Sequence, residues 1–489
     1  MNEKLSSREF FWPLLIIGLG LLVCGQSLTN AFCWDDSAYL WDNPKIPYWA
    51  GLSQIWFAPG TPADAFLDYP LALATFGLGH KLWGLNPWGY HTLNLTLHVL
   101  NALLLLKLIR RIKPEFAGIT ALLFIIYPVQ VGTVAWISEL KNLLCLCFFL
   151  AFLSFLDYEN NRQRKNYLKM LLFFTASLLS KCIGVCFATI PLLYAWHRNG
   201  SFSKRAFSIT LPLLFLNAIA ILLSIQKQNA NPEVLTLPHF PENIILAGKA
   251  FFFYINQILL PQHFLFFYPK WNIPMILLSN WIHTAGGLFL YAIFYWNRHR
   301  WGRGAFELLC FHGISILPAL GFIKISFMYG SHMADHFSYL SAPPLLLFAC
   351  ISLHFLFSKA KSYLFAKSIH PSPLLKKSLI TTGVIYLAVT SFRLTKNYKD
   401  TMTLFSNLLL QTPRSLFAFF FTGTELTGSN PKNAVLFLQK AIHYKPDFQY
   451  AFENLGETEK AVQARQEGLR LIPKSDAARK NQEMAQTAF

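Results

Sequence analysis

Two adjacent carboxylates follow the first apolar segment of the chain, in the sequence Trp34-Asp35-Asp36. Neighbouring side chains of an extended loop point to opposite sides, so one carboxylate can face a cavity while the other holds the loop. A carboxylate whose pKa is raised by partial desolvation can act as a general base. The competing interpretation is an ordinary turn or an interfacial cap, which is the commoner role of a bare Asp-Asp pair.

Charged side chains also stand at the ends of later apolar segments. Glu139 and Lys141 lie between two such segments, and Lys181 ends another. Lysines at these positions are commonly membrane anchors, but anchors favour the inner side, so phosphate binding is an equal alternative for these outer lysines. One short outer loop carries four further polar side chains: Tyr329, His332, Asp335 and His336.

A polar stripe runs along the second apolar segment, because His91, Asn94, His98 and Asn101 recur at helical spacing. Polar groups within a membrane span usually face the interior of the helix bundle. The stripe can support a site, although interhelical hydrogen bonding alone would also explain it.

The composition excludes an ordinary soluble enzyme as the setting for these residues. Of 489 residues, 54% are hydrophobic and only 13% are charged, too few charges to cover a soluble surface of this size. The net charge of +18 does not indicate nucleic-acid binding, because the cations fall in every second loop, the positive-inside pattern. These blocks are Lys107, Arg110, Arg111 and Lys113; Arg162, Arg164, Lys165 and Lys169; Arg198, Lys204 and Arg205; Arg298, Arg300 and Arg303; and Lys359, Lys361, Lys367, Lys376 and Lys377.

The apolar runs predict an all-α polytopic membrane protein with about eleven transmembrane helices. The expected spans are 11–28, 91–109, 116–130, 142–156, 167–181, 183–197, 206–225, 275–296, 305–320, 339–357 and 376–392. We interpret 247–266 as a re-entrant or interfacial helix, because a further crossing would place the Arg298 block outside. The membrane domain would then cover 1–392, with long outer loops at 29–90 and 226–274.

An odd number of spans places the tail, residues 393–489, opposite a cytoplasmic N-terminus. In a bacterium this means an inner-membrane protein with a periplasmic tail, and in a eukaryote an ER-membrane protein with a luminal tail. The tail prolines Pro413, Pro446 and Pro473 are spaced by 33 and 27 residues, near the ~34-residue period of tetratricopeptide repeats. Such repeats predict a protein partner, and a generic helical hairpin is the alternative.

The eight cysteines lie mostly within apolar runs and indicate neither a disulfide framework nor a metal site.

Taken together, the motifs resemble those of protein O-mannosyltransferase-like membrane glycosyltransferases of the GT-C superfamily, most closely the branch with tetratricopeptide repeats. The similarity covers about residues 30–345. It rests on Trp34-Asp35-Asp36-Ser37, Asn43-Pro44, Leu82-Trp83-Gly84-Leu85-Asn86-Pro87, Gly89-Tyr90-His91 with Asn94 and His98, Tyr127-Pro128-Val129-Gln130, Val134 to Glu139, Ser180-Lys181, Met333-Ala334-Asp335 and Tyr339-Leu340.

The resemblance implies a GT-C-like fold and transfer of a sugar, with mannose as the first choice, from a polyprenyl-phosphate carrier on the outer face. The acceptor hydroxyl would belong to a protein Ser or Thr or to a glycan, and the reaction would invert the sugar centre. The family's acidic pair carries over to Asp35 as the base and Asp36 as its positioning partner. A departing phosphate needs cations rather than a paired acid, and the candidates are Lys141, Lys181 and His336. Glu139, His91, Asn94 and Asp335 would support the site, and no metal ligands are assigned.

The sequence departs from the family pattern at four places. Tyr69 stands before Pro70 where the family has an arginine, Gly132 replaces a glutamate, Leu140 replaces an arginine, and Asp335 is followed by His336 and Phe337 instead of Arg-Tyr. A catalytically inactive scaffold that presents the repeats is therefore an alternative. A transporter or flippase of lipid-linked sugars is another, although paired broken helices at mid-membrane are not evident in the sequence.

Overall fold

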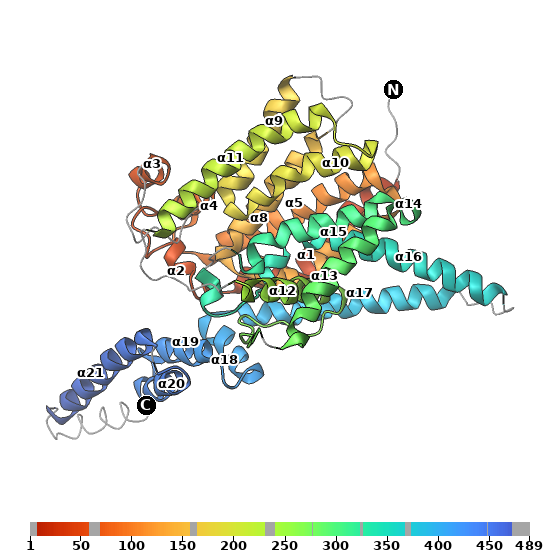
Figure 1. Ribbon diagram of the computed structural model, residues 1–489. Coiled ribbons are helices and arrows are strands. Elements are labelled where there is room, and N and C mark those ends of the chain that lie inside the picture. Colours follow the sequence, from red (N-terminus) through yellow and green to blue (C-terminus); the bar gives the residue numbers. More distant parts are fainter. Residues whose placement is uncertain are drawn as a thin grey trace.

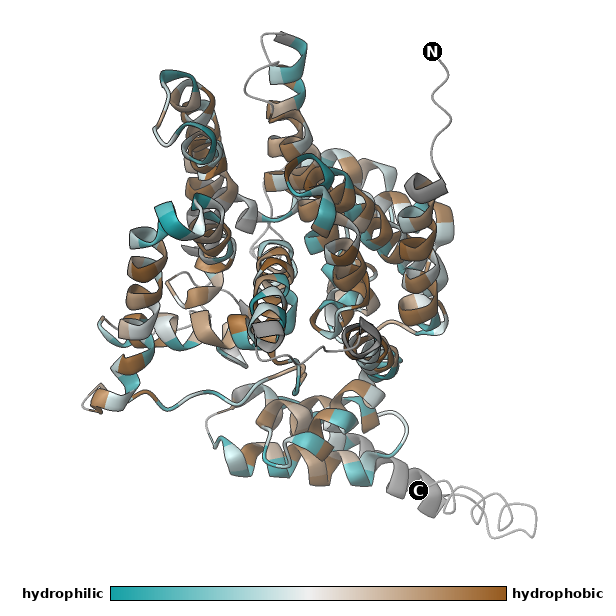
Figure 2. Cartoon of the chain, turned by 90° about the vertical axis from the view of Figure 1, so that its right-hand side faces the viewer, coloured by the Kyte–Doolittle hydropathy of each residue, from teal (hydrophilic) through white to brown (hydrophobic). Residues whose placement is uncertain are grey.

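The computed structural model describes residues 7–57, 69–156, 164–229, 240–275, 277–322, 326–366, 373–446 and 448–471. Throughout these ranges the regular secondary structure is helical, which confirms the all-α class (Figure 1). A bundle of apolar helices forms most of the molecule. The tail helices form a smaller group beside one end of this bundle and carry more hydrophilic residues (Figure 2).

The bundle begins with α1 and ends with α17, and its first half carries most of the buried core. The helices of this half are α1 (Ser7–Cys24), α4 (Pro70–Trp83), α5 (Pro87–Ile112), α6 (Pro114–Ile126), α7 (Val131–Ala135), α8 (Leu140–Phe155) and α9 (Arg164–Ser180). Those of the second half are α10 (Ile190–Asn199), α11 (Lys204–Asn229), α12 (Glu242–Leu259), α13 (Leu278–Trp296), α14 (Arg298–Trp301), α15 (Arg303–Ile316), α16 (Ala342–Ala366) and α17 (Pro373–Thr395).

Six helical segments of the described chain are long and apolar enough to cross a membrane, or seven if one bent pair counts as a span. They are Phe10–Thr29, Pro87–Ile112, Ile137–Phe155, Lys204–Leu222, Ala342–Tyr363 and Lys377–Tyr398. The predicted total of eleven is not confirmed. One reason is that α10 and α15, with 10 and 14 residues, are shorter than the ~17–25 residues of a membrane-spanning helix. Helix α12 is not among the six segments either.

The bent pair brings the chain into the region of the predicted site. Helix α6 ends at Ile126, and the continuation Pro128–Ala135 leaves at an angle of 52°. Pro128 explains the break, because a proline has no N–H for the helical ladder and disfavours helical geometry in the residue before it. After α7, the short 3-10 helix η4 (Ile137–Glu139) leads directly into α8, so the residues from Ser138 to Lys141 lie at the end of a bundle helix.

The same end of the bundle holds the segment that follows α1 and the start of the tail. Ala31 N donates to Lys399 O at 2.8 Å, and Asn30 Nδ2 donates to Thr395 O at 3.4 Å. The C-terminal ends of α1 and α17 therefore lie close together, at the end of the bundle beside the tail (Figure 1). The predicted outer loop 29–90 contains helices α2 (Asp36–Tyr39), α3 (Trp49–Phe57) and α4.

The tail forms helices α18 (Thr401–Gln411), α19 (Leu416–Leu426), α20 (Pro431–Tyr444) and α21 (Gln449–Leu471). Asp400, Ser415 and Asn430 cap the first three through side-chain hydrogen bonds to backbone N–H groups, which stabilises each start. The tail packs on the bundle through one apolar cluster that joins Cys33, Trp136 and Phe266 to Phe405 and Leu408. Its classification as tetratricopeptide repeats stays a prediction, and Pro473 lies outside the described residues.

Candidate functional site

Asp35 and Asp36 meet the chain between α7 and α8 through one hydroxyl group. Ser138 Oγ lies 2.7 Å from Asp35 Oδ1 and 2.6 Å from Asp36 Oδ1. Asp36 also accepts the backbone N–H groups of Ser138 and Cys33, both at 2.8 Å. Asp36 is thus buried and accepts three hydrogen bonds, whereas Asp35 is half-buried and accepts one hydrogen bond from this serine.

The two carboxylates differ in electrostatics as well. Burial, and then the charge of Asp35, raise the pKa of Asp36 to about 7 against the opposing effect of its three donors. Burial also raises the pKa of Asp35, which the charge of Lys141 and the Ser138 hydroxyl partly offset. A carboxylate with a raised pKa that is still reachable from solvent has the properties of a general base. Asp35 meets this description better than its neighbour.

Trp34 fixes the backbone that leads into these carboxylates. Its φ of 47° lies in the left-handed region, which is uncommon for a residue other than glycine. The indole packs against Trp136, Phe266 and Phe267 with ring centroids 5.1 to 5.5 Å apart, and Trp34 N donates to Thr401 Oγ1 at 2.9 Å. Aromatic packing and a bond to the tail therefore hold a strained conformation next to Asp35.

Glu139 brings the two predicted phosphate-binding lysines together. Lys141 Nζ lies 3.2 Å from Glu139 Oε1, and Lys181 Nζ lies 3.6 Å from Glu139 Oε2. All three side chains are buried, and a buried ionic group is tolerated only when it is paired. Within these three side chains the two ammonium groups exceed the one carboxylate by a single positive charge, although Asp35 also lies close enough to act on Lys141. Two ammonium groups held together can donate hydrogen bonds to an anion.

Neighbouring polar groups hold this ionic cluster in place. Asn142 Nδ2 donates to Glu139 Oε2 and to His336 O, and Lys141 Nζ donates to Tyr39 OH at 3.1 Å. Burial lowers the pKa of His336 to about 3, with Glu139 opposing the shift and the two lysines adding to it. His336 is therefore a neutral ring beside the cluster, which can donate one N–H but supplies no charge.

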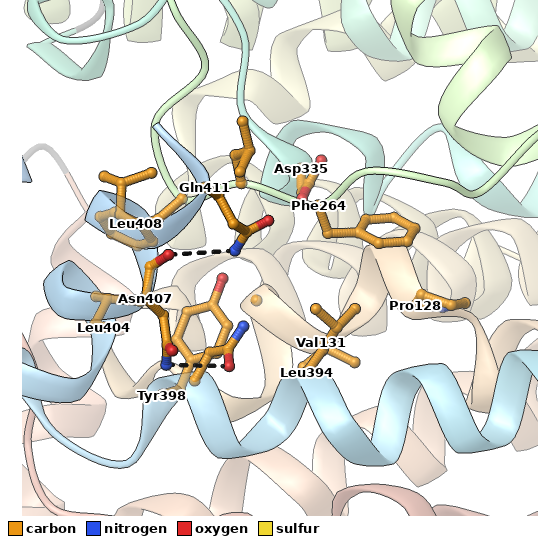
Figure 3. A pocket seen from close by; sticks show the side chains of 14 residues that line it. Pro128, Val131, Phe264, Asp335, Leu394, Tyr398, Leu404, Asn407, Leu408 and Gln411 are labelled. Atoms are coloured by element: carbon orange, nitrogen blue, oxygen red, sulfur yellow. Dashed lines mark hydrogen bonds between the residues drawn. The ribbon is translucent and has the colours of Figure 1, made fainter. Parts of the chain in front are cut away.

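Asp335 points away from this cluster, toward a different set of residues. It accepts a hydrogen bond from Tyr268 OH at 2.7 Å and lines a cavity of about 20 Å³ that α18 closes with Asn407 and Gln411 (Figure 3). Such a volume holds about one water molecule. Burial raises the pKa of Asp335 to about 8, although the tyrosine opposes this. The structure thus separates Asp335 from the lysines.

The polar stripe of α5 hydrogen-bonds to its neighbours. Asn94 Nδ2 donates to Trp136 O at 3.1 Å, so it supports the segment that carries Ser138. His98 Nδ1 lies 2.9 Å from Tyr339 OH, and Asn101 Nδ2 donates to the same hydroxyl at 3.1 Å. Buried His91 lies beside the backbone of Asn30 and Ala31, just before the acidic pair. The stripe therefore forms hydrogen bonds between helices, and a supporting role of His91 and Asn94 at the site stays a prediction.

The departures from the family pattern have local structural explanations. A Cβ at Gly132 would lie 2.7 Å from Tyr398 OH, so this tyrosine fills the space of a larger side chain. Leu140 is buried in the main apolar core, and Tyr69 lies close enough to act electrostatically on Lys141.

Among the described residues, no group of three or more His, Cys, Asp or Glu side chains could hold a metal ion.

Sequence reasoning did not assign roles to Ser138, Tyr39, Asn142 or Tyr268. Ser138 and Asn142 adjoin Glu139 and Lys141 in the sequence, so their proximity to charged candidates was the available signal. Tyr39 follows the acidic pair by one helical turn and could have been found in the same way. Tyr268 lies 67 residues before Asp335, and no local pattern connects the two.

Comparison with known proteins gives relatives among the protein O-mannosyl-transferases. The chain is 32% identical over 186 residues to protein O-mannosyl-transferase TMTC1 of Mus musculus. The aligned region covers 36% of this chain and 18% of that protein. It is 29% identical over 181 residues to TMTC4 of Homo sapiens (31% of this chain, 24% of the relative). The match to Tmtc1 of Drosophila melanogaster is 30% over 190 residues (37% and 22%).

These matches confirm the predicted resemblance to the protein O-mannosyl-transferases. They cover less than a quarter of each of these relatives. No protein-family model matches the chain, and no solved structure matches it.

Proposed function

We propose that this relative of the protein O-mannosyl-transferases is a membrane glycosyltransferase. In this proposal the donor is a sugar, mannose first, on a polyprenyl-phosphate carrier, and the acceptor is a Ser or Thr hydroxyl of a protein. Transfer takes place at the end of the bundle where the tail begins. The observation that carries the proposal is the convergence there of the half-buried Asp35 with the paired lysines Lys141 and Lys181.

The chemistry requires one base and a site for a leaving anion. Asp35 would take the proton of the acceptor hydroxyl while its oxygen attacks C1 of the sugar. The bond between C1 and the phosphate oxygen breaks, and its electron pair stays on the phosphate. A single displacement of this kind inverts the sugar centre. Because phosphate is stable as an anion, no paired acid is needed.

Lys141 and Lys181 would stabilise the departing phosphate. Both ammonium groups are buried and fixed by Glu139 before the substrate binds, and charges preorganised in a desolvated site are more effective than charges in water. Asp36 would position the loop, since its oxygens already accept three hydrogen bonds. His336, as a neutral ring, would add one N–H at most.

The test is transfer of radiolabelled mannose from polyprenyl-phosphate-mannose to a Ser/Thr-rich acceptor peptide by the purified protein in lipid nanodiscs. The Asp35→Asn variant keeps shape but loses the base, and we expect its rate to fall by about 10²–10⁴-fold. Asp42→Asn is the matched control, because Asp42 is an exposed carboxylate of the same outer segment.

Loss of transfer in Asp35→Asn with full activity in Asp42→Asn supports the proposal. Equal activity in the wild type and Asp35→Asn would exclude Asp35 as the base. If the wild type transfers neither mannose nor another polyprenyl-phosphate-linked sugar, the scaffold interpretation replaces the transferase.

A further inference from the structure

A groove separates the tail from the outer segment that follows α12. Its volume is about 630 Å³, within the range of ligand sites, roughly 300–1,000 Å³. One wall is formed by residues 267–270 and Gly330, and the other by the turn between α18 and α19 together with Lys445. The groove therefore exists only because the tail is docked on the bundle.

The groove is lined by cations and aromatic groups. Lys270, Arg414 and Lys445 line it, and the described lining residues include no carboxylate. Partial burial and the neighbouring ammonium of Lys445 lower the pKa of Lys270, as expected for two cations held close together. Helix α19 also starts in this wall, at Leu416, and the first turn of a helix adds partial positive charge. These features favour an anionic ligand.

The floor of the groove adjoins the candidate active site. Phe267 and Phe417 line the groove and stack with centroids 5.2 Å apart. The ring of Phe267 also packs on Trp34 at 5.5 Å, and Trp34 precedes Asp35. One aromatic layer thus separates the groove from the loop that carries the base.

We propose that this groove binds an acidic segment of the acceptor polypeptide, in which carboxylate side chains alternate with apolar ones. Carboxylates would pair with Lys270, Arg414 and Lys445, and apolar side chains would pack on Phe267 and Phe417. A free phosphate would use only the cations, and a lipid headgroup would need a path for its acyl chains past the tail helix α19. The identification of the segment as an acceptor rests on the proposed transferase function, whereas the binding itself does not.

Binding of a fluorescein-labelled peptide with repeated Glu-Leu-Thr-Glu sequence tests this, measured by fluorescence anisotropy with the full chain in phosphatidylcholine nanodiscs. The groove variant combines Lys270→Gln, Arg414→Gln and Lys445→Gln. The matched control combines Lys432→Gln, Lys440→Gln and Lys460→Gln, which removes the same charge from exposed positions of the tail. We expect the groove variant to bind about tenfold more weakly or worse, and the control to stay within about twofold of the wild type.

Several outcomes would overturn the proposal. These are no peptide binding by the wild type, equal losses in both triple variants, equal binding of a Lys-Leu-Thr-Lys peptide, or groove-dependent binding of phosphatidylserine vesicles but not of the acidic peptide. The Asp35→Asn variant separates the two proposals. If it binds the peptide like the wild type while neither protein transfers sugar, the groove stands and the transferase fails. If the wild type transfers sugar and the groove variant binds the peptide as well as the wild type does, the transferase stands and the groove proposal fails.

Discussion

Replacing Ser138 by alanine tests whether one hydroxyl sets the protonation of both aspartates. The substitution removes a donor that lies 2.7 Å from Asp35 and 2.6 Å from Asp36. Asp36 keeps two backbone N–H donors, from Cys33 and from residue 138 itself, so its loop should stay in place. Since hydrogen bonding to the ionised form lowers a carboxyl pKa, its loss raises the pKa of Asp35.

The size of the effect follows from the geometry. A hydrogen bond to a charged group contributes about 1.5–3 kcal/mol, and one pKa unit corresponds to about 1.4 kcal/mol. Because one hydroxyl proton is shared by two carboxylates, Asp35 loses roughly half of this contribution. The base must be ionised to act, so a higher pKa moves the acidic limb of kcat/KM toward higher pH, by about half a unit to one unit.

The assay is the pH dependence of kcat/KM for sugar transfer by the wild type and Ser138→Ala. Ser37→Ala is the control, because Ser37 follows the acidic pair but no hydrogen bond joins its hydroxyl to either aspartate among those of the described structure. An acidic limb that stays in place, or moves to lower pH, would refute the assigned role of Ser138. A uniform loss of rate at every pH would show that the serine only holds the fold.

Two further predictions concern Asp335 and Lys181. Burial raises the pKa of Asp335 to about 8 from its ordinary 3.8. Between these values the folded state holds a proton that the unfolded state releases. The contribution of this group to stability is therefore full below about pH 4 and is lost as the pH rises through about 8. Between about pH 6 and pH 9, the Tm of Asp335→Asn should therefore fall by less than the Tm of the wild type. An equal fall of Tm with pH in the two proteins would contradict this. Lys181→Gln should weaken binding of the polyprenyl-phosphate donor about tenfold or more. The control Lys249→Gln removes a cation that lies over Trp271 and should leave donor binding unchanged. Equal donor affinities of the two variants would show that Lys181 is not part of the site.

The sequence was sufficient to predict the all-helical class and the membrane location, because both follow from composition and apolar periodicity. The order and spacing of short motifs also identified the relationship to the protein O-mannosyl-transferases. The number of spans was harder to predict. Apolar runs such as 183–197 and 305–320 give the same hydropathy signal whether their helices cross a bilayer alone or stop short, and α10 and α15 are too short to do so alone.

The chain by itself thus determined which ionisable residues stand near the ends of apolar segments, since local sequence decides where such a segment ends. Only the tertiary structure decided how these residues pair. Ser138 bridges carboxylates more than 100 residues away, Glu139 joins lysines from the ends of two different helices, and Asp335 turns to Tyr268 instead. The physical reason is that such side-chain contacts depend on how separate helices pack in space, and the spacing of residues along one helix does not fix that packing.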